Sequence, residues 1–162
     1  MKLVTIIQAR RGSTRLPNKV MLDLCGKELI VRMVERVLSA KKSGKVVVAT
    51  TLNKEDDQIE EICKREGFEC FRGHETDLLD RHYQAALKYR GDVVVKIPSD
   101  VPLIDSKVID KVISFYENNQ NEYDFVSNLH PQSYPDGNDV EIMSMKMLEL
   151  AHQQAKQEYE RE

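Results

Sequence analysis

The sequence predicts a layered α/β domain, and three observations lead to that prediction. Short apolar and β-branched runs, such as Leu3–Gln8, alternate along the chain with longer amphipathic stretches, a pattern typical of strands and helices packed in layers. The length of 162 residues suits one domain with a single core. Hydrophobic residues at 41% and charged residues at 31% are typical of a globular protein. We therefore expect residues 1–162 to form one domain.

The first three elements follow from this patterning. Residues 3–8 are predicted to form a buried first strand. A helix is expected over residues 28–42, where apolar side chains recur at helical spacing, and Gly44 should end it. A second strand is predicted at residues 45–50. The apolar positions of this helix are Leu29, Ile30, Met33, Val34, Val37 and Leu38.

The middle of the chain continues the alternation. A helix is predicted over residues 53–65, with Asn53 as its N-cap and with an acidic first turn that suits the helix dipole. Gly67 should end this helix, and a short strand is expected at residues 69–71. A further helix is predicted at residues 76–89. Its inward side chains are expected to be Leu79, Tyr83, Ala86 and Leu87.

The second half begins with the most strand-like stretch, residues 92–97, which Pro98 closes. Asp105 or Ser106 can cap the helix that follows. Its apolar positions repeat at helical spacing: Val108, Ile109, Val112, Ile113 and Tyr116. Two more strands and a last helix are predicted at residues 124–128, 140–144 and 146–159.

Charge and hydropathy exclude several classes of partner. The chain has 24 Lys and Arg against 27 Asp and Glu, a net charge of −3, which argues against a general nucleic-acid or anionic-membrane surface. No apolar run approaches the roughly 20 residues of a membrane-spanning helix, and the first residues are too few for a signal sequence. We therefore expect a cytoplasmic protein.

Cysteine and histidine usage gives little support for a disulfide or a zinc site. Cys25, Cys63 and Cys70 are odd in number and lack CxxC spacing, so reduced packing thiols are the favoured interpretation. The four histidines are scattered along the chain.

A basic loop follows the predicted first strand. Its cations are Arg10, Arg11, Arg15 and Lys19, and the small residues Gly12, Ser13 and Thr14 lie between them. In parallel α/β sheets, ligands bind at the carboxyl ends of the strands, and phosphates are commonly bound after the first. Small residues let backbone N–H groups approach an anion, and arginine and lysine donate to phosphate oxygens. The loop therefore suits a triphosphate.

Three other interpretations of this loop fit the residues less well. A solvated surface loop is disfavoured, because five basic residues, counting Lys2, precede the first acid at Asp23. The GxxxxGK[ST] loop is excluded, because the segment has one glycine and places Pro17 where a helix should start. No GxGxxG for dinucleotide binding is present.

The segment "QARRGSTRLPNKVMLDLCGKELI" resembles the A-R-x-x-S-x-R-L-P-x-K signature of the CMP-sugar-acid synthetases, which include 3-deoxy-manno-octulosonate cytidylyltransferase. The segments "VVVATT", "DDQIEEIC", "CFRGHETDLLDRHYQAA", "VVVKIPSDVPLID" and "YPDGNDVEIMS" are similar to the branch of spore-coat polysaccharide cytidylyltransferases. The resemblance implies a three-layer α/β/α nucleotide-diphospho-sugar transferase fold, Rossmann-like, with a mostly parallel sheet.

The resemblance also implies an activity. Such enzymes transfer CMP from CTP to an acceptor oxygen of a sugar acid or related sugar and release pyrophosphate, with Mg²⁺, in surface polysaccharide or glycoconjugate biosynthesis. Related sugar-nucleotide pyrophosphorylases carry a glycine-rich loop instead, so Arg10 disfavours a uridylyl- or guanylyltransferase. Homodimers are common among similar proteins.

The resemblance assigns roles to residues of the loop and of "IPSDVPLID". Nucleotide binding falls to Ala9, Arg10, Gly12, Ser13, Arg15, Lys19 and Ser99, and Arg10, Lys19 and Asp100 are the expected catalytic residues. Asp100 matches the metal aspartate of the family. A carboxylate at a strand end can hold Mg²⁺, but Asp and Pro also suit a turn that leads into a helix.

Two further segments have weaker assignments. Gly73, Asp80 and Arg81 match the region around the nucleobase and ribose, although Arg81 could equally be an exposed helix residue paired with Asp77. Acceptor-binding residues are implied at Asp136, Asp139 and Glu141, within a Pro-Asp-Gly-Asn run that is also a good turn.

Similar proteins are usually longer and continue into an acidic segment that contributes to the metal site. The resemblance therefore implies that this chain lacks a C-terminal portion of its nucleotidyltransferase domain. A second hypothesis follows, a nucleotide-binding module or fragment without turnover.

Overall fold

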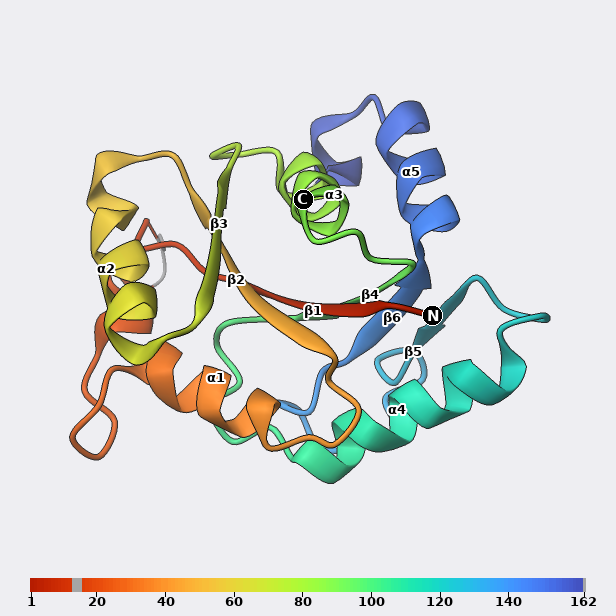
Figure 1. Cartoon of the computed structure of the whole chain (residues 1–162), viewed down its shortest axis with the longest axis horizontal. Coiled ribbons are helices and arrows are strands. Elements are labelled where there is room, and N and C mark those ends of the chain that lie inside the picture. Colours follow the sequence, from red (N-terminus) through yellow and green to blue (C-terminus); the bar gives the residue numbers. More distant parts are fainter. Residues whose placement is uncertain (13–15, 162) are drawn as a thin grey trace.

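The computed structural model contains a six-stranded sheet with helices on both faces (Figure 1). The structure describes residues 1–12 and 16–161. The strand order across the sheet is β3-β2-β1-β4-β6-β5. The strands are β1 (Leu3–Gln8), β2 (Lys45–Thr51), β3 (Glu69–Gly73), β4 (Val93–Ile97), β5 (Phe125–Ser127) and β6 (Glu141–Ser144). The predicted three-layer α/β/α architecture is confirmed.

The sheet is mostly parallel, as predicted. β1 pairs in parallel with β2 and β4, and β2 pairs in parallel with β3. β6 runs antiparallel to β4, and β5 antiparallel to β6. The central strand β1 is buried from Leu3 to Ile7 because helices cover both of its faces. The register sets Ile7 beside Val48 and Ile97, so β1, β2 and β4 end at the same edge.

The helices form two outer layers. α1 and α4 cover one face of the sheet, and α3 and α5 cover the other (Figure 1). The helices are α1 (Leu29–Leu38), α2 (Asp57–Glu66), α3 (Leu78–Lys88), α4 (Ser106–Asn119) and α5 (Met145–Gln154), with 3₁₀ turns at Lys19–Met21, Lys54–Asp56 and Glu158–Glu160. Within the described part of the chain, no helix is long and apolar enough to cross a bilayer.

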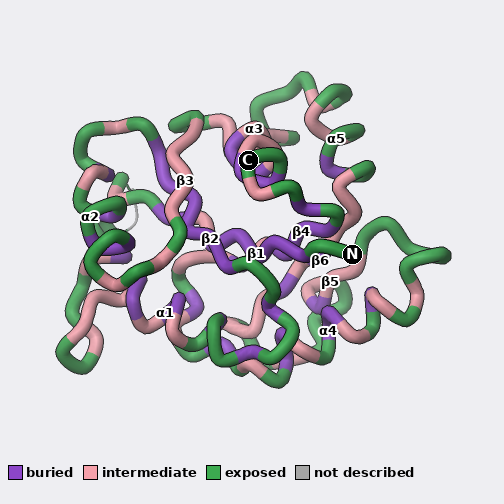
Figure 2. Tube along the Cα trace, viewed as in Figure 1, coloured by how far each residue is buried: buried purple, intermediate pink, exposed green. Residues whose placement is uncertain are grey.

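The sheet separates two hydrophobic clusters, and Figure 2 shows that the central strands β1, β2 and β4 are mostly buried. Ile7 packs into the larger cluster with side chains of α1 and α4. Ile6 points to the opposite face, where Ala86 of α3 and Leu148 of α5 pack. This alternation also places Gln8, two residues after Ile6, on the α3 face. All three cysteines are free thiols, with Cys63 buried.

Two helices end earlier than predicted. The first was expected to reach residue 42, but α1 ends at Leu38. The chain turns there because Asp110 of α4 accepts hydrogen bonds from the backbone N–H groups of Lys41 and Lys42 at 3.1 and 2.8 Å. The last helix was expected to reach residue 159, but α5 ends at Gln154. Arg161 terminates it by donating to the carbonyl oxygens of His152 and Ala155 at 3.1 and 2.9 Å.

The other helices follow the predicted pattern more closely. Asp105 caps α4 through the backbone N–H of Lys107 at 2.8 Å, and all five predicted apolar positions of α4 are buried. Gly67 ends α2 in the left-handed region at φ 75°, as a C-terminal glycine commonly does. In α3 the prediction for Leu87 was wrong, because Leu87 is 48% exposed and Ala85 is buried instead.

Candidate active site

A cavity of about 540 Å³ opens at the carboxyl ends of β1 and β4. These neighbours are the point at which the strand order changes direction, since β2 and β3 lie on one side of β1 and β4 on the other. Ligands bind at such switch points in open α/β sheets. The wall residues are Gln8, Ala9, Arg10, Lys19, Val20, Glu75, Thr76, Leu78, Arg81, Pro98, Ser99, Asp100 and Glu158.

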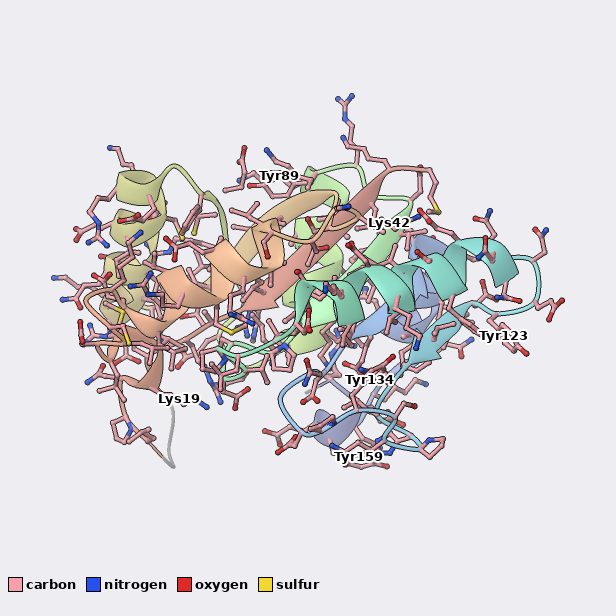
Figure 3. The ribbon with its side chains drawn as sticks, turned by 90° about the horizontal axis from the view of Figure 1, so that it is seen from below. Lys19, Lys42, Tyr89, Tyr123, Tyr134 and Tyr159 are labelled. Carbon is pink, nitrogen blue, oxygen red and sulfur yellow. The ribbon has the colours of Figure 1, made fainter. Side chains whose placement is uncertain are left out.

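Figure 3 shows which labelled residues lie on the same side of the molecule as Lys19, a wall residue of the cavity. Lys19, Tyr134 and Tyr159 lie along one edge, and Lys42 and Tyr89 lie along the opposite one. The loop after β1, the loop between β5 and β6, and the C-terminal 3₁₀ turn therefore share one edge. This edge carries the candidate site.

Lys19 and Asp100 meet at the cavity, although 81 positions separate them in sequence. The Nζ atom of Lys19 lies 2.8 Å from Oδ2 of Asp100, with side chains that are 24% and 40% exposed. Buried Val20 fixes the 3₁₀ turn that carries Lys19, and Asp100 follows β4 by three residues. A partly exposed ion pair is worth about 1 kcal/mol or less. Each group can therefore exchange its partner for a ligand at little cost.

Arg10 and Arg81 add positive charge to the same cavity. The Arg81 side chain is buried, and its Nη1 donates to the carbonyl oxygens of His74 and Glu75 at 2.7 and 3.1 Å. Its Nε has no partner among the described residues. Burial, and then the charge of Arg10, lower the pKa of Arg81 to about 10, so Arg81 remains protonated at neutral pH. Two guanidinium groups without a bound carboxylate in the described chain favour an anionic ligand.

The alternative that Arg81 is exposed and paired with Asp77 is wrong. Arg81 is 4% exposed. Asp77 instead caps α3 through the backbone N–H of Asp80 and accepts from Nε of Arg161 at 2.7 Å. The partner lies 84 positions away in sequence, so local spacing could not indicate it.

Of the other two residues assigned with Arg81, neither lines the cavity. Gly73 ends β3 directly behind Arg81, and a Cβ atom there would lie 2.7 Å from Cε1 of Phe71 and 3.1 Å from Cγ of Arg81. The glycine therefore permits α3 to approach β3. Asp80 turns toward α5 and accepts from His152 and Gln84 at 2.9 and 3.1 Å.

The start of the basic loop is anchored away from the cavity. Arg11 donates from Nη1 to the carbonyl oxygen of Glu55 and from Nε to Oδ1 of Asn18, both at 2.8 Å. The backbone N–H of Arg11 donates to Asp56 at 2.8 Å, and the Thr51 hydroxyl donates to the same carboxylate. Asp56 is 1% exposed. Arg11 therefore braces the loop, and Asp56 is a positioning residue that the sequence indicated only as a helix-dipole acid.

The remaining assigned residues are distributed as follows. Ala9 and Ser99 line the cavity, whereas Gly12 is exposed at the start of the loop. Ser13 and Arg15 lie outside the described residues. The sequence analysis missed Gln8 and Glu158, which also line the cavity. A polar residue at the end of the buried strand β1 was the signal that could have indicated Gln8. Its side-chain oxygen is buried without a partner in the described structure.

The residues assigned to the acceptor lie beside the cavity rather than in its wall. Burial, the charge of Asp136 and the charge of Asp100 raise the pKa of Asp139. Asp139 therefore shares an electrostatic environment with Asp100. Glu141 pairs with Lys96 at 2.8 Å.

A magnesium ion fits these residues in one particular way. Within residues 1–12 and 16–161, no three His, Cys, Asp or Glu side chains form a metal-binding group. Mg²⁺, however, is usually held by one or two carboxylates together with substrate phosphates and waters. Asp100 offers such a carboxylate at the cavity, so the residues suit an ion that arrives with a polyphosphate.

Comparisons with known proteins agree with this geometry. A family model described as cytidylyltransferase matches residues 4–162. An uncharacterized protein of Methanocaldococcus jannaschii is 41% identical over the whole chain, which covers 65% of that protein. The spore coat polysaccharide biosynthesis protein SpsF of Bacillus subtilis is 33% identical over 78% of this chain and 54% of its own length. The 3-deoxy-manno-octulosonate cytidylyltransferase of Brucella ovis is 38% identical over 70% of this chain and 45% of its own.

Two solved structures resemble the chain, one in sequence and fold and the other in fold. A cytidylyltransferase from Leptospira borgpetersenii superposes with a TM-score of 0.96 at 39% identity, over all of this chain and 68% of that one. A CMP:2-keto-3-deoxy-manno-octonic acid synthetase, complexed with CTP, has a TM-score of 0.79 at 20% identity, over 97% of this chain and 80% of its own, and shows the fold alone. The chain thus spans about half to two thirds of the length of the curated relatives given above.

Proposed function

Since the chain belongs to the cytidylyltransferase family, we propose that it transfers the CMP group of CTP to an oxygen of a sugar acid or related sugar and releases pyrophosphate. The observation that carries this proposal is the meeting of Lys19 and Asp100 at a cavity that Arg10 and Arg81 also line. These residues supply cations for a polyphosphate and a carboxylate for its metal.

The proposed step requires no nucleophile from the protein. The oxygen of an acceptor hydroxyl attacks the α-phosphorus of CTP and its proton passes to solvent, and the bond from that phosphorus to the bridging oxygen breaks as pyrophosphate leaves. Negative charge grows on the leaving phosphates, so fixed cations near them stabilise the transition state. We assign this stabilisation to Lys19 and Arg10. Arg81, which also lines the cavity, adds positive charge. Bound Mg²⁺, held by Asp100, would neutralise further charge on the triphosphate.

The ion pair between Lys19 and Asp100 positions both residues in the protein without nucleotide. Asp100 holds the Lys19 ammonium at the cavity before CTP arrives. When the nucleotide binds, Lys19 turns to phosphate oxygens and Asp100 becomes available for the metal. The pair therefore keeps two groups positioned at a small cost in binding energy.

The wider assignments rest on the relatives. The name of the Bacillus subtilis protein supports a role in surface polysaccharide or glycoconjugate biosynthesis, and that of the Brucella ovis enzyme supports a sugar-acid acceptor. We assign Asp136, Asp139 and Glu141 to the acceptor on the family resemblance of the segment that carries them, and the charge of Asp100, which contributes to the raised pKa of Asp139, is compatible with a position near the cavity. Further assignments are nucleotide binding by Gly12, Ser13 and Arg15, a cytoplasmic location and a homodimer. Gly73 and Asp80 do not line the cavity, so we assign them a supporting role around Arg81 and α3 rather than direct contact with the nucleotide.

A second candidate is a nucleotide-binding module without turnover. It is favoured by the lack, among the described residues, of a complete group of three metal-ligating side chains. Pyrophosphate release from CTP and Mg²⁺, measured with a panel of ulosonic and aminosugar acids, separates the two candidates. We expect release with at least one acceptor, whereas CTP binding without any release would favour the module.

Nucleotide choice provides an independent test of the same proposal. CTP is expected to raise the melting temperature of the chain more than UTP or GTP at equal concentration, because a ligand that binds the folded state more tightly stabilises it more. A larger shift with UTP or GTP would reject a CTP-using enzyme.

We expect Asp56 to contribute to the affinity for the β- and γ-phosphates of CTP and not to the affinity for its nucleoside monophosphate part. In Asp56→Ala the partly buried Arg11 N–H loses its acceptor, which costs about 1–3 kcal/mol in the conformation that positions the loop. We expect CTP affinity to fall about tenfold, equivalent to about 1.4 kcal/mol, and CMP affinity to stay within about twofold because CMP lacks the β- and γ-phosphates. Calorimetry with both nucleotides measures this difference.

The control for Asp56 is Glu61→Ala, an exposed carboxylate on α2, which should change neither affinity. Asp56→Asn retains one acceptor oxygen and should lose less CTP affinity than the alanine variant. Equal losses for CTP and CMP would mean that Asp56 supports the fold alone.

A further inference from the structure

The C-terminal 3₁₀ turn, Glu158–Glu160, contributes Glu158 to the wall of the cavity that contains Lys19. The turn follows α5 and belongs to no strand of the sheet. Figure 3 shows Tyr159, a residue of this turn, on the same side of the molecule as Lys19. The place of Glu158 at the cavity therefore depends on the contacts that hold the turn against the rest of the fold.

Arg161, directly after the turn, makes these contacts. Its Nε donates to Oδ2 of Asp77 at 2.7 Å, and its carbonyl oxygen accepts the backbone N–H of Leu79 at 2.9 Å. Its Nη1 donates to the carbonyl oxygens of His152 and Ala155 at 3.1 and 2.9 Å. Figure 1 shows the C-terminal end of the chain beside α3. Arg161 thus joins the start of α3, the end of α5 and the C-terminal turn.

The partners of Arg161 are themselves fixed. Asp77 caps α3, because its Oδ1 accepts the backbone N–H of Asp80 at 2.8 Å. The side chains of Arg161 and Asp77 are each only 21% exposed. Glu160 braces the turn by accepting the backbone N–H groups of two residues before it, both at 2.9 Å. The start of α3 and the C-terminal turn therefore form one continuous wall of the cavity. We call it the α3 wall, and its residues are Glu75, Thr76, Leu78 and Glu158.

The α3 wall differs in charge from the side formed by the loop after β1. Its polar residues Glu75, Thr76 and Glu158 are exposed and line the cavity, so ligands can reach them. The loop after β1 instead supplies the cations Arg10 and Lys19. Opposite charges therefore face one another across the cavity.

Arg81 also lines the cavity and holds the loop that leads into α3. Its Nη1 donates to the carbonyl oxygens of His74 and Glu75 at 2.7 and 3.1 Å. These bonds fix the backbone of the α3 wall from within the fold. Arg81 and Arg161 therefore hold the two ends of this wall.

The charges of the α3 wall select one half of a nucleotide. Carboxylates repel phosphate groups, and they accept hydrogen bonds from hydroxyl and amino groups. The nucleoside portion of CTP carries such donors on its ribose and its base, whereas the fully ionised triphosphate carries none. The cations of the opposite side suit the phosphates. The two sides of the cavity thus match the two halves of the nucleotide.

We propose that the α3 wall binds the nucleoside portion of the nucleotide, and that Arg161 is the positioning residue that holds this wall at the cavity. The inference rests on the proposed function. Arg161 acts through Asp77 and through the turn that carries Glu158, rather than by contact with the ligand.

Calorimetry on Arg161→Ala, with CMP and with inorganic tripolyphosphate in EDTA, tests this proposal. CMP carries the nucleoside portion, tripolyphosphate carries phosphates alone, and EDTA removes any contribution from a metal. We expect CMP affinity to fall about tenfold, since a small displacement of a binding wall can cost that much, and tripolyphosphate affinity to stay unchanged. Equal losses for both ligands would mean that Arg161 supports the fold alone. Unchanged CMP affinity, or no CMP binding by wild type, would also overturn the proposal.

Amide hydrogen exchange at Leu79 tests the positioning step itself. This N–H lies in the first turn of α3, where it has no acceptor within the helix, and it donates to the carbonyl oxygen of Arg161. We expect faster exchange at Leu79 in Arg161→Ala, because the turn that carries its acceptor is released. Unchanged exchange would contradict the role of Arg161 in holding the turn.

A second variant keeps the test valid if Arg161→Ala does not fold. Asp77→Asn retains an oxygen that can cap α3 but loses the charge that pairs with Arg161. It should lose CMP affinity, less than Arg161→Ala, and keep tripolyphosphate affinity. Lys156→Ala, an exposed cation of the same segment, is the control that should bind both ligands as wild type does. Unchanged CMP affinity in a folded Asp77→Asn variant would overturn the proposal.

The outcome is separate from that of the proposed function. Binding of CMP and tripolyphosphate needs neither an acceptor nor turnover. A chain that releases no pyrophosphate but loses CMP affinity in Arg161→Ala would support this inference and reject the enzyme. Pyrophosphate release together with unchanged CMP affinity in the variants would do the reverse.

Discussion

Asp100→Asn is expected to bind CTP and to release pyrophosphate at no more than about one hundredth of the wild-type rate. Removing one group that stabilises transition-state charge typically costs 10²–10³ in rate. The amide has the shape of the carboxylate but lacks its charge, so it should hold Mg²⁺ poorly. Because the carboxylate lies 2.8 Å from Lys19 at the cavity, its removal should also reduce repulsion of the triphosphate. CTP affinity in the absence of Mg²⁺ should therefore be equal to wild type or higher.

Calorimetry with EDTA and with MgCl₂, together with the pyrophosphate assay, measures these effects. Wild type should gain CTP affinity from Mg²⁺, and Asp100→Asn should gain little. The matched control is Glu122→Gln, an exposed carboxylate between α4 and β5, which should behave as wild type. A fully Mg²⁺-dependent rate in Asp100→Asn would exclude Asp100 as the metal residue.

The sequence predicted the sheet well because the strand signals are local and strong. β1 and β4 are short, mainly apolar and β-branched runs that Ala9 and Pro98 follow, and such runs need no tertiary information to be found. The ends of α1 and α5 were predicted poorly, because distant side chains decide them. Asp110 turns the chain after α1, and Arg161 ends α5.

Some residues of the candidate site could likewise be predicted from local sequence, and others could not. Lys19 and Asp100 each lie in a segment that follows a strand, and the family resemblance assigns both to the nucleotide. Their 2.8 Å contact is visible only in the structure. Arg81 was harder to place, because a buried cation without a bound acid is unexpected on a helix surface. The role of Asp56 depends on its hydrogen bond to the Arg11 backbone and on burial, which composition and spacing do not encode.

Lys19→Ala is expected to weaken CTP binding by roughly 1.5–3 kcal/mol, the net worth of a hydrogen bond to a charged group. This corresponds to a loss of about 10- to 150-fold in affinity. Lys19→Arg keeps the charge and should lose less, and Lys64→Ala, an exposed lysine on α2, is the control that should lose nothing. Titration calorimetry with CTP measures all three variants.

The contact between Lys19 and Asp100 in the free protein allows a sharper form of this prediction. If Lys19 only neutralised Asp100, Lys19→Ala would have no effect once Asp100→Asn had removed the charge. If Lys19 binds the triphosphate, Lys19→Ala should lower Mg²⁺-free CTP affinity about tenfold or more in the Asp100→Asn background as well. The double-mutant cycle separates the two roles, since the residues are in direct contact at 2.8 Å. Unchanged CTP affinity in Asp100→Asn/Lys19→Ala relative to Asp100→Asn would remove Lys19 from the phosphate site.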